Sequence, residues 1–351
     1  MVFPLSVLDL SSVDSGSSSG QALQNTIKLA QLADRLGYTR YWLAEHHNTS
    51  MLASSTPEIM IGHVAQATKR IRVGSGGVML PNHSPLKVAE TFRVLEALHP
   101  GRIDLGIGRA PGTDPRTALA LRRSREALGA DDFPEQLAEL LAFSGEGEGF
   151  PGSNPFRSVQ AIPTDVHLPP IWLLGSSDYS AQAAATLGVG FAFAHHINPN
   201  FAVPAIEIYR AIFEPSEWLK ESRVILTTSV VCADTDERAE ELTSSMALAW
   251  VRMRSGRSAP LPSPEEAKAY HYTAAEQALA REYRSRQTVG RPEVVRERLL
   301  NLMKETGADE LMISSIVYGY ENRARTYELL AEAFELQRPP VVTGEAVQET
   351  S

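Results

Sequence analysis

Cysteine is almost absent from this chain: of its 351 residues, only Cys232 carries a thiol. A single thiol excludes internal disulfides, iron–sulfur clusters and zinc sites built from several thiolates. The chain also lacks an apolar run near the ~18 residues that a membrane helix needs. Its first ten residues lack the basic segment and long apolar core of a secretory signal. We therefore expect a cytoplasmic protein without a membrane span.

Basic residues are too few to dominate the surface. The chain has 33 Lys and Arg against 42 Asp and Glu, a formal net charge of −9. This balance disfavours nucleic acids and anionic membranes as partners. The length is long for one domain, but α/β barrels often exceed ~250 residues as a single unit. A single large domain that acts on small molecules fits these properties.

Short apolar runs alternate with amphipathic segments along the chain. Leu23 and Ile27, for example, begin a helical spacing that ends at Gly37, a typical helix C-cap. Eight strands, nearly all followed by helices and without an internal repeat, predict an α/β fold, a (β/α)8 TIM barrel with insertions. The predicted strands are residues 3–10, 41–44, 71–78, 103–108, 171–174, 191–194, 224–232 and 310–316.

We predict one barrel domain over residues 1–336, followed by a flexible tail at 337–351. Its excess length is explained by insertions at about 113–169 and 255–288, which are candidate lids. A doubly wound open sheet is disfavoured, because no Gly-x-Gly-x-x-Gly follows the first strand.

Glu45, His46 and His47 follow the second predicted strand directly. Loops at the carboxyl ends of barrel strands converge on one mouth, so this cluster is a candidate active site. Adjacent strand residues point to opposite faces, so one histidine can face the mouth while the other should not. We favour a mouth histidine that transfers protons or orients substrate. The alternatives are a metal ligand, disfavoured because no His-x-x-x-His pair occurs, and a histidine merely hydrogen-bonded at a strand end.

Glycines interrupt the third predicted strand at Gly74, Gly76 and Gly77. Glycine weakens a strand, so this cluster indicates a bulge, a strained peptide or a ligand pressed against the backbone. A flat ring packed on the strand end would need the missing bulk. A plain bulge at a barrel corner is the alternative.

Two features favour an anion such as phosphate. The loop Gly175–Ser176–Ser177 lies between a strand and a helix, where free N–H groups and the positive helix end attract an anion. Arg109 ends the neighbouring strand and offers a charged partner. Ser and Asp are also ordinary N-caps, so the loop alone is weak evidence. His195 and His196 end the sixth predicted strand, and either line the same mouth or lie exposed there.

Taken together and in order, several motifs resemble the bacterial luciferase-like flavin monooxygenases. The resemblance spans roughly residues 3–336, apart from the insertions. Its pieces are residues 42–47 (WLAEHH), 73–81 (VGSGGVMLP), 95–102 (LEALHPGR), 106–109 (GIGR), 172–177 (WLLGSS), 289–293 (VGRPE) and 306–312 (TGADELM).

The resemblance implies a barrel that binds reduced FMN at the carboxyl ends of its strands. Reduced FMN (FMNH2) then reacts with O2 to form a C4a-hydroperoxide, which inserts one oxygen atom into an organic substrate. His46, with Glu45 beside it, matches the family's catalytic position. The resemblance also implies a non-prolyl cis peptide near Gly76 and Gly77. It assigns cofactor contacts to Ser75, Gly76, Gly77, Asn82, Arg109, Gly175, Ser176, Ser177 and Tyr179, and we assign substrate contacts to His195 and His196.

The chain departs from the light-emitting members at two positions. Gly108 stands where they have a reactive cysteine, and Gly175 stands where they have a glutamate. The pattern is similar to the non-luminescent single-chain branch, which includes natural-product (antibiotic) tailoring enzymes. The resemblance further implies a homodimer and a separate flavin reductase. Two alternatives stay open: an F420-dependent hydride-transfer oxidoreductase and a flavin-binding protein without turnover.

Overall fold

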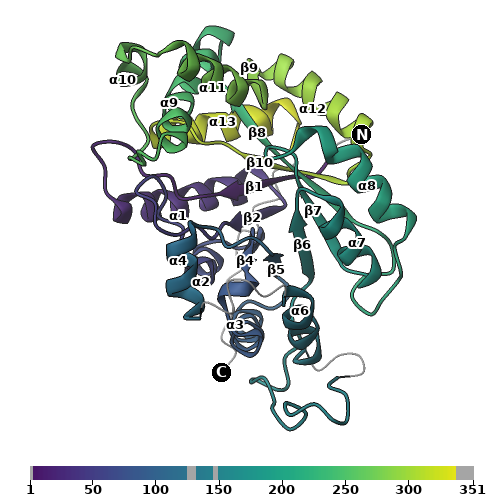
Figure 1. The fold of residues 1–351 in the computed structure, drawn as a ribbon. Coiled ribbons are helices and arrows are strands. Elements are labelled where there is room, and N and C mark those ends of the chain that lie inside the picture. The colour runs from purple at the N-terminus through teal and green to yellow at the C-terminus, as the bar shows by residue number, and fades with distance from the viewer. Residues whose placement is uncertain (1–2, 125–131, 145–148, 337–351) are drawn as a thin grey trace, which may run out of the picture.

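The computed structural model describes residues 3–124, 132–144 and 149–336. The predicted tail at 337–351 lies outside these ranges, as does most of a helical break that the sequence predicts near 129–133. Figure 1 shows a central ring of strands with helices around it. The strands are β1 (Leu5–Asp9), β2 (Arg40–Leu43), β3 (Arg72–Ser75), β4 (Val78–Met79), β5 (Ile103–Gly108), β6 (Ile171–Gly175), β7 (Gly190–Ala194), β8 (Val224–Cys232), β9 (Gln287–Gly290) and β10 (Glu310–Ser314).

The strands form a closed parallel barrel, which confirms the predicted fold. Eight strands pair in the order β10-β1-β2-β3-β5-β6-β7-β8, and β8 closes the ring by pairing with β10. The helices are α1 (Ser19–Leu36), α2 (Pro57–Ala67), η1 (Leu80–Asn82), α3 (Pro85–Leu98), α4 (Pro115–Arg122), α6 (Phe133–Ala142), α7 (Asp178–Thr186), η2 (Pro199–Phe201), α8 (Ala202–Ala211), α9 (Asp236–Arg254), α10 (Pro264–Ala269), α11 (Ala274–Ser285), α12 (Pro292–Thr306) and α13 (Tyr320–Ala333).

Two short strands differ from the prediction. The third predicted strand divides into β3 and β4 at Gly76 and Gly77, whose peptide bond is cis, and both pieces pair with β5. β9 is not among the predicted strands, because its four residues directly follow a charged helical pattern. It pairs with the last four residues of β8, of which only Ser229 also pairs with β10.

A small apolar cluster with residues from six strands of the ring fills the barrel interior. It contains Leu8, Trp42, Ala44, Trp172, Ala192, Ile225 and Met312. Side chains alternate along a strand, so the residues between these positions point outward into the larger core beneath the helices. Below the cluster, Arg40 forms ion pairs with Asp104 at 2.8 Å and Glu310 at 3.0 Å. These charges are paired inside the barrel, at the end opposite the mouth.

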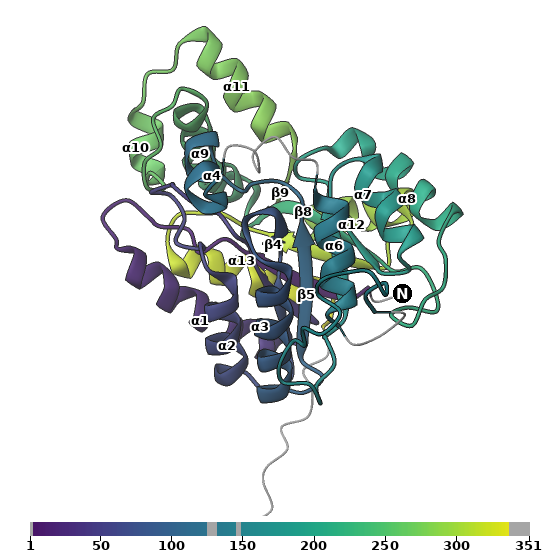
Figure 2. The ribbon, with the colours of Figure 1, turned by 60° about the horizontal axis from the view of Figure 1, so that its bottom comes forward.

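The segment between α9 and β9 contacts loops at the mouth. The Ser15 N–H donates to the Leu261 carbonyl at 2.8 Å, and the Leu261 N–H donates to Val13 at 2.8 Å. Thr49 and Ser258 hydroxyls lie 3.2 Å apart, so this segment contacts the loops that follow β1 and β2. Figure 2 shows α10 and α11 projecting from one end of the molecule. Among the described helices, none is long and apolar enough to cross a membrane.

Candidate active site at the barrel mouth

The end of β2 sends Glu45 and His46 to opposite faces. Trp42 and Ala44 lie in the interior cluster, and His46 continues this inward series two residues later. Leu43 belongs to the outer core, and the Glu45 side chain is fully buried on that side. The sequence left open which of the two histidines faces the mouth; the structure places His46 there.

Glu45 holds three mouth segments together. Its carboxylate accepts hydrogen bonds from His47 Nε2 at 2.9 Å, from His83 Nε2 at 3.0 Å and from the Met79 N–H at 2.8 Å. Burial would raise the pKa of Glu45, but the hydrogen bonds and charge of His83, with His47 and Met79, outweigh burial and lower it. The carboxylate is therefore ionised and fully occupied by protein donors, so we assign Glu45 to positioning rather than to contact with reactants.

His46 keeps a polar atom without a partner. The backbone N–H of His46 donates to the Ser54 carbonyl at 2.8 Å, which fixes the backbone. The side-chain Nδ1 is buried and makes no hydrogen bond within the described residues. Burial lowers the pKa of His46; Glu45 opposes this shift, and His47 and His196 add to it. The imidazole is therefore neutral at pH 7 and able to accept or give a hydrogen bond. A buried polar atom normally has a partner, so this one fits a bound group.

The glycines between β3 and β4 are needed for close strand packing. A Cβ on Gly76 would lie 2.5 Å from Leu8 Cδ1, and one on Gly77 would lie 2.8 Å from the Gly106 carbonyl. The Ser75 hydroxyl is buried and bonds to the Gly106 backbone at 2.8 Å and 2.9 Å, so this side chain faces β5. Only the backbone of Ser75 is left for a ligand, and contact of this segment with a flat ring stays a prediction.

Arg109 and the start of α7 lie together, as an anion site requires. The exposed Arg109 guanidinium carbon sits 4.1 Å from the ring centroid of Tyr179, the second residue of α7. Ser177 precedes the helix, and its hydroxyl makes no capping hydrogen bond. Gly175 is required here because a Cβ would lie 2.0 Å from Ser180 Oγ. A charged donor, the Ser177 hydroxyl and the positive helix end are thus available to one phosphate.

Asn82 and Ser176 have protein partners. Asn82 Nδ2 donates to the Pro111 carbonyl at 3.0 Å, and its Oδ1 accepts from Arg122 at 3.3 Å. The Ser176 carbonyl accepts from Asn198 at 2.9 Å. These contacts connect loops around the mouth, and the predicted cofactor contacts of both residues stay predictions.

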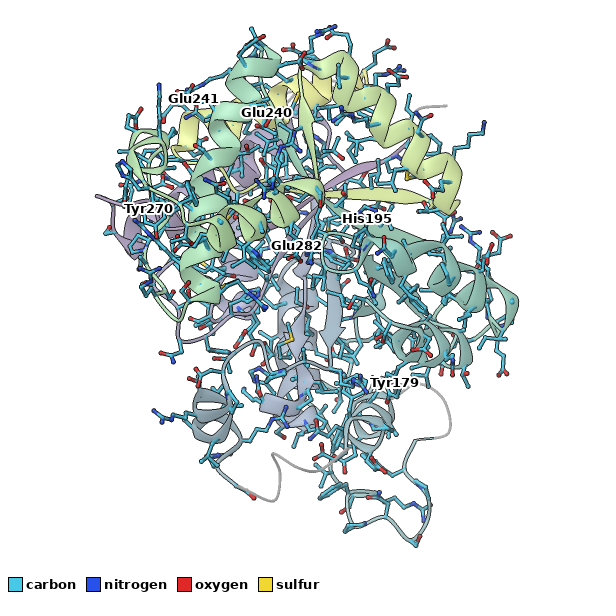
Figure 3. All side chains as sticks on the ribbon, turned by 45° about the horizontal axis from the view of Figure 1, so that its top comes forward. Tyr179, His195, Glu240, Glu241, Tyr270 and Glu282 are labelled. Carbon is cyan, nitrogen blue, oxygen red and sulfur yellow. The ribbon has the colours of Figure 1, made fainter. Side chains whose placement is uncertain are left out.

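His195 and His196 differ in their surroundings. The backbone N–H of His196 donates to the Thr227 carbonyl at 3.2 Å, and its side-chain Nδ1 contacts the same carbonyl at 3.1 Å. His195 Nδ1 instead lies 3.4 Å from the Thr228 hydroxyl. Burial, with a smaller contribution from His196, lowers the pKa of His195 to about 4, and burial also lowers the pKa of His196. Figure 3 labels His195 at the end of β7 and Tyr179 at the start of α7.

Sequence reasoning missed His83 as a site residue. His83 contacts Glu45 although the two lie 38 positions apart, and the sequence around His83 gives no indication of that contact. Its place after the Pro81–Asn82 turn, beside the glycine-interrupted strand, was the only available signal. The described residues contain no group of three or more His, Cys, Asp or Glu side chains placed to hold a metal ion.

Comparisons with known proteins show the family of this chain and agree with its fold. The profile of the family described as luciferase-like monooxygenase matches residues 3–310. A luciferase-like monooxygenase of Escherichia coli (strain K12) is 41% identical over 330 residues, 94% of this chain and 96% of that protein. The N-acetyl-S-alkylcysteine monooxygenase of Bacillus subtilis (strain 168) is 36% identical over 337 residues, 94% and 97% of the two chains. The crystal structure of apo-MsnO8 superposes with a TM-score of 0.85 at 39% identity, covering 96% of this chain and 99% of that one.

Proposed function

This chain belongs to the luciferase-like monooxygenase family, and from that premise we propose that it uses reduced FMN and O2 to insert one oxygen atom into a small organic substrate. The proposal is carried by one observation. Arg109 stacks on Tyr179 at the N-terminus of α7, where charge and helix end favour an anion, and the strands before Arg109, α7 and His46 end at the same mouth. A phosphate held beside Arg109 would leave the rest of the cofactor near the His46 imidazole.

The residues at the mouth fit a phosphorylated flavin. Arg109, with Ser177 and the first turn of α7, would hold the phosphate by charge and hydrogen bonding. The backbone of Ser75, Gly76 and Gly77 would support the ring, since backbone approaches a ligand most closely where side chains are absent. When bound, reduced FMN would supply the two electrons that activate O2.

The protein's own contributions follow from its geometry. His46 is neutral, so its imidazole can take a proton from the reacting group or hold a hydrogen bond to it. Glu45 keeps His46 in place through His47 and keeps the β4 segment in place through Met79 and His83. The segment between α9 and β9 contacts the loops after β1 and β2 at the mouth, and we propose that it helps to exclude water from a reaction that water interrupts.

Isotopic labelling tests the proposal directly. We expect the chain, supplied with reduced FMN by a separate flavin reductase and with labelled O2, to transfer one labelled oxygen atom to a member of a small-molecule panel, detected by mass spectrometry. Oxidation of reduced F420 without oxygen uptake would instead identify a hydride-transfer oxidoreductase. FMN binding without product from any compound would identify a flavin-binding protein. The family matches are with monooxygenases, which favours the first outcome.

We also propose a homodimer formed through α2 and α3. Large apolar side chains are exposed on both helices: Ile59 by 60%, Val94 by 46% and Leu98 by 66%. Apolar side chains exposed together commonly mark a protein contact, and a second copy of the chain is the natural occupant. We propose a natural-product substrate on narrower grounds, namely that Gly108 and Gly175 stand at the positions that separate this sequence from light-emitting members.

A further inference from the structure

The turn after β7 brings His196 against the neighbouring strand. The His195 N–H donates to Phe193 at 3.1 Å, and this tight turn ends the regular alternation of β7. The next residue, His196, is then held by the Thr227 carbonyl of β8. Thr227 follows Ile225 of the interior cluster by two residues, so its side chain also faces inward.

His46 and His196 approach the mouth from opposite sides. They follow β2 and β7, which are four strands apart in either direction around the eight-strand ring. Both residues follow strands whose carboxyl ends meet at the same mouth, and the positive charge that His196 would carry contributes to the lowered pKa of His46. A substrate group bound on the barrel axis therefore lies between them.

The hydrogen bond to Thr227 fixes the tautomer of His196. A carbonyl oxygen only accepts, so His196 Nδ1 must carry the proton in the 3.1 Å contact. Burial disfavours the doubly protonated ring, which leaves the imidazole neutral at pH 7. Its Nε2 is then a bare acceptor, and the described part of the chain offers it no donor. The His196 side chain is partly exposed, so the mouth can supply that donor.

We propose that His196 Nε2 is a fixed hydrogen-bond acceptor that selects substrates bearing an O–H or N–H group close to the atom that is oxygenated. The inference rests on the proposed function, because it assigns the substrate class of that same site. An analogue without the donor would displace water from this acceptor and leave it unpaired, and we expect it to bind about ten- to a hundredfold more weakly. His195 does not share this role, because its Nδ1 faces a hydroxyl that can either donate or accept.

Nitrogen NMR of the full chain tests the premise without turnover. With nitrogen-15 in the nine histidines and His196→Asn used for assignment, we expect the His196 proton on Nδ1 and a bare Nε2 at pH 7. A proton on Nε2, or on both nitrogens, would overturn the proposal.

Matched probes test selection. Phenol and anisole differ by the donor, and we expect the FMN-loaded wild type to bind phenol about ten- to a hundredfold more tightly. His196→Asn keeps a donor for Thr227 but removes Nε2, so it should bind both probes alike; His195→Asn should keep the preference. Three results would contradict the assignment. The wild type shows no preference for phenol over anisole, or His196→Asn keeps that preference, or the substitution changes only the affinity for FMN. These measurements report binding and not turnover. A wild type that oxygenates no compound would therefore contradict the proposed function without affecting this test.

Discussion

At the residue scale, His46 carries the proposed chemistry. Strand alternation predicted that only one of the adjacent histidines would face the mouth, and the interior positions of Trp42 and Ala44 identify His46 as that residue. The partners of Glu45 could not be predicted in this way. Met79 and His83 reach it from 34 and 38 positions away, through a turn whose path depends on the closed barrel.

We predict that His46→Ala lowers the rate of oxygenation by about 10²- to 10⁴-fold, the usual contribution of a positioned acid or base. FMN affinity should change little, since we propose that the phosphate is held at Arg109 and not at His46. Product formation under single turnover and FMN titration measure the two effects separately. His99→Ala, at the far end of α3, is the matched control, and unchanged turnover in His46→Ala would remove this residue from the mechanism.

Arg109→Ala should weaken FMN binding by roughly 1.5–3 kcal/mol, the value of a hydrogen bond to a charged group. Riboflavin lacks the phosphate, so its affinity should fall far less. Fluorescence titration with both flavins measures the difference. Equal losses for FMN and riboflavin would place Arg109 at the ring rather than at the phosphate, and no loss for either would remove it from the site.

The contribution of the Glu45–His83 pair to stability should depend on pH. The pKa of Glu45 lies below its ordinary 4.5, so its contribution is present above that value and disappears as the pH falls through the lowered pKa. Burial would lower the pKa of His83, but Glu45 and Glu58 outweigh it and raise the pKa above 6.5. The His83 contribution is therefore present below 6.5 and disappears as the pH rises through the raised pKa.

Wild type and Glu45→Gln should consequently differ most in unfolding free energy between pH 4.5 and 6.5, and less on either side. Denaturant titrations over a pH series measure this, with the exposed Glu335→Gln as control. A difference that is independent of pH would mean that the charge of the pair is not what stabilises the mouth.

At the scale of elements, β3 and β5 approach each other more closely than side chains allow. A Cβ on Gly106 would lie 2.0 Å from the Ser75 carbonyl. The sequence placed a strand across residues 71–78, and its glycines indicated an interruption. The family resemblance located a cis peptide near Gly76 and Gly77, and the structure confirms it. The residue pattern alone did not locate the interruption, since it depends on the contact with β5. β9 escaped prediction for a similar reason, because its four residues are a strand only through pairing with β8.

Gly106→Ala should therefore destabilise the fold by about 1–3 kcal/mol, because neither backbone can move without disturbing the ring. Gly62→Ala is the matched control. Its Cβ would meet Leu95 at 3.6 Å, an ordinary contact, and alanine favours the helix. Thermal unfolding should show a lower midpoint only for Gly106→Ala. Equal midpoints for the two variants would show that the strands can separate at no cost.

At the scale of the whole molecule, the alternation of strands and helices was sufficient to predict a closed barrel. The sequence does not fix which loops meet over its mouth. The bonds from Leu261 to Val13 and Ser15 join segments about 250 positions apart in the chain, and they exist only because the barrel closes. For the same reason, the sequence predicts where the mouth lies but not which residues line the substrate site.

The proposed dimer makes a prediction at this scale. Leu98→Asp places a charge on an apolar side chain that is 66% exposed on α3, and it should convert dimer to monomer at micromolar concentration. Ile212→Asp, at a 45% exposed apolar position beside α8, is the control and should leave the assembly intact. Sedimentation or light scattering reports the mass. A monomeric wild type, or a dimer that persists in Leu98→Asp, would refute this interface.

The central claim is that one ring of strand ends holds a phosphorylated flavin next to His46, and a crystal structure of the chain with FMN tests it most directly. We predict the phosphate at Arg109 and the first turn of α7, with the ring system on the Gly76–Gly77 backbone and within reach of the His46 imidazole. Density for FMN anywhere else on the molecule, or a phosphate bound away from Arg109, would contradict the account.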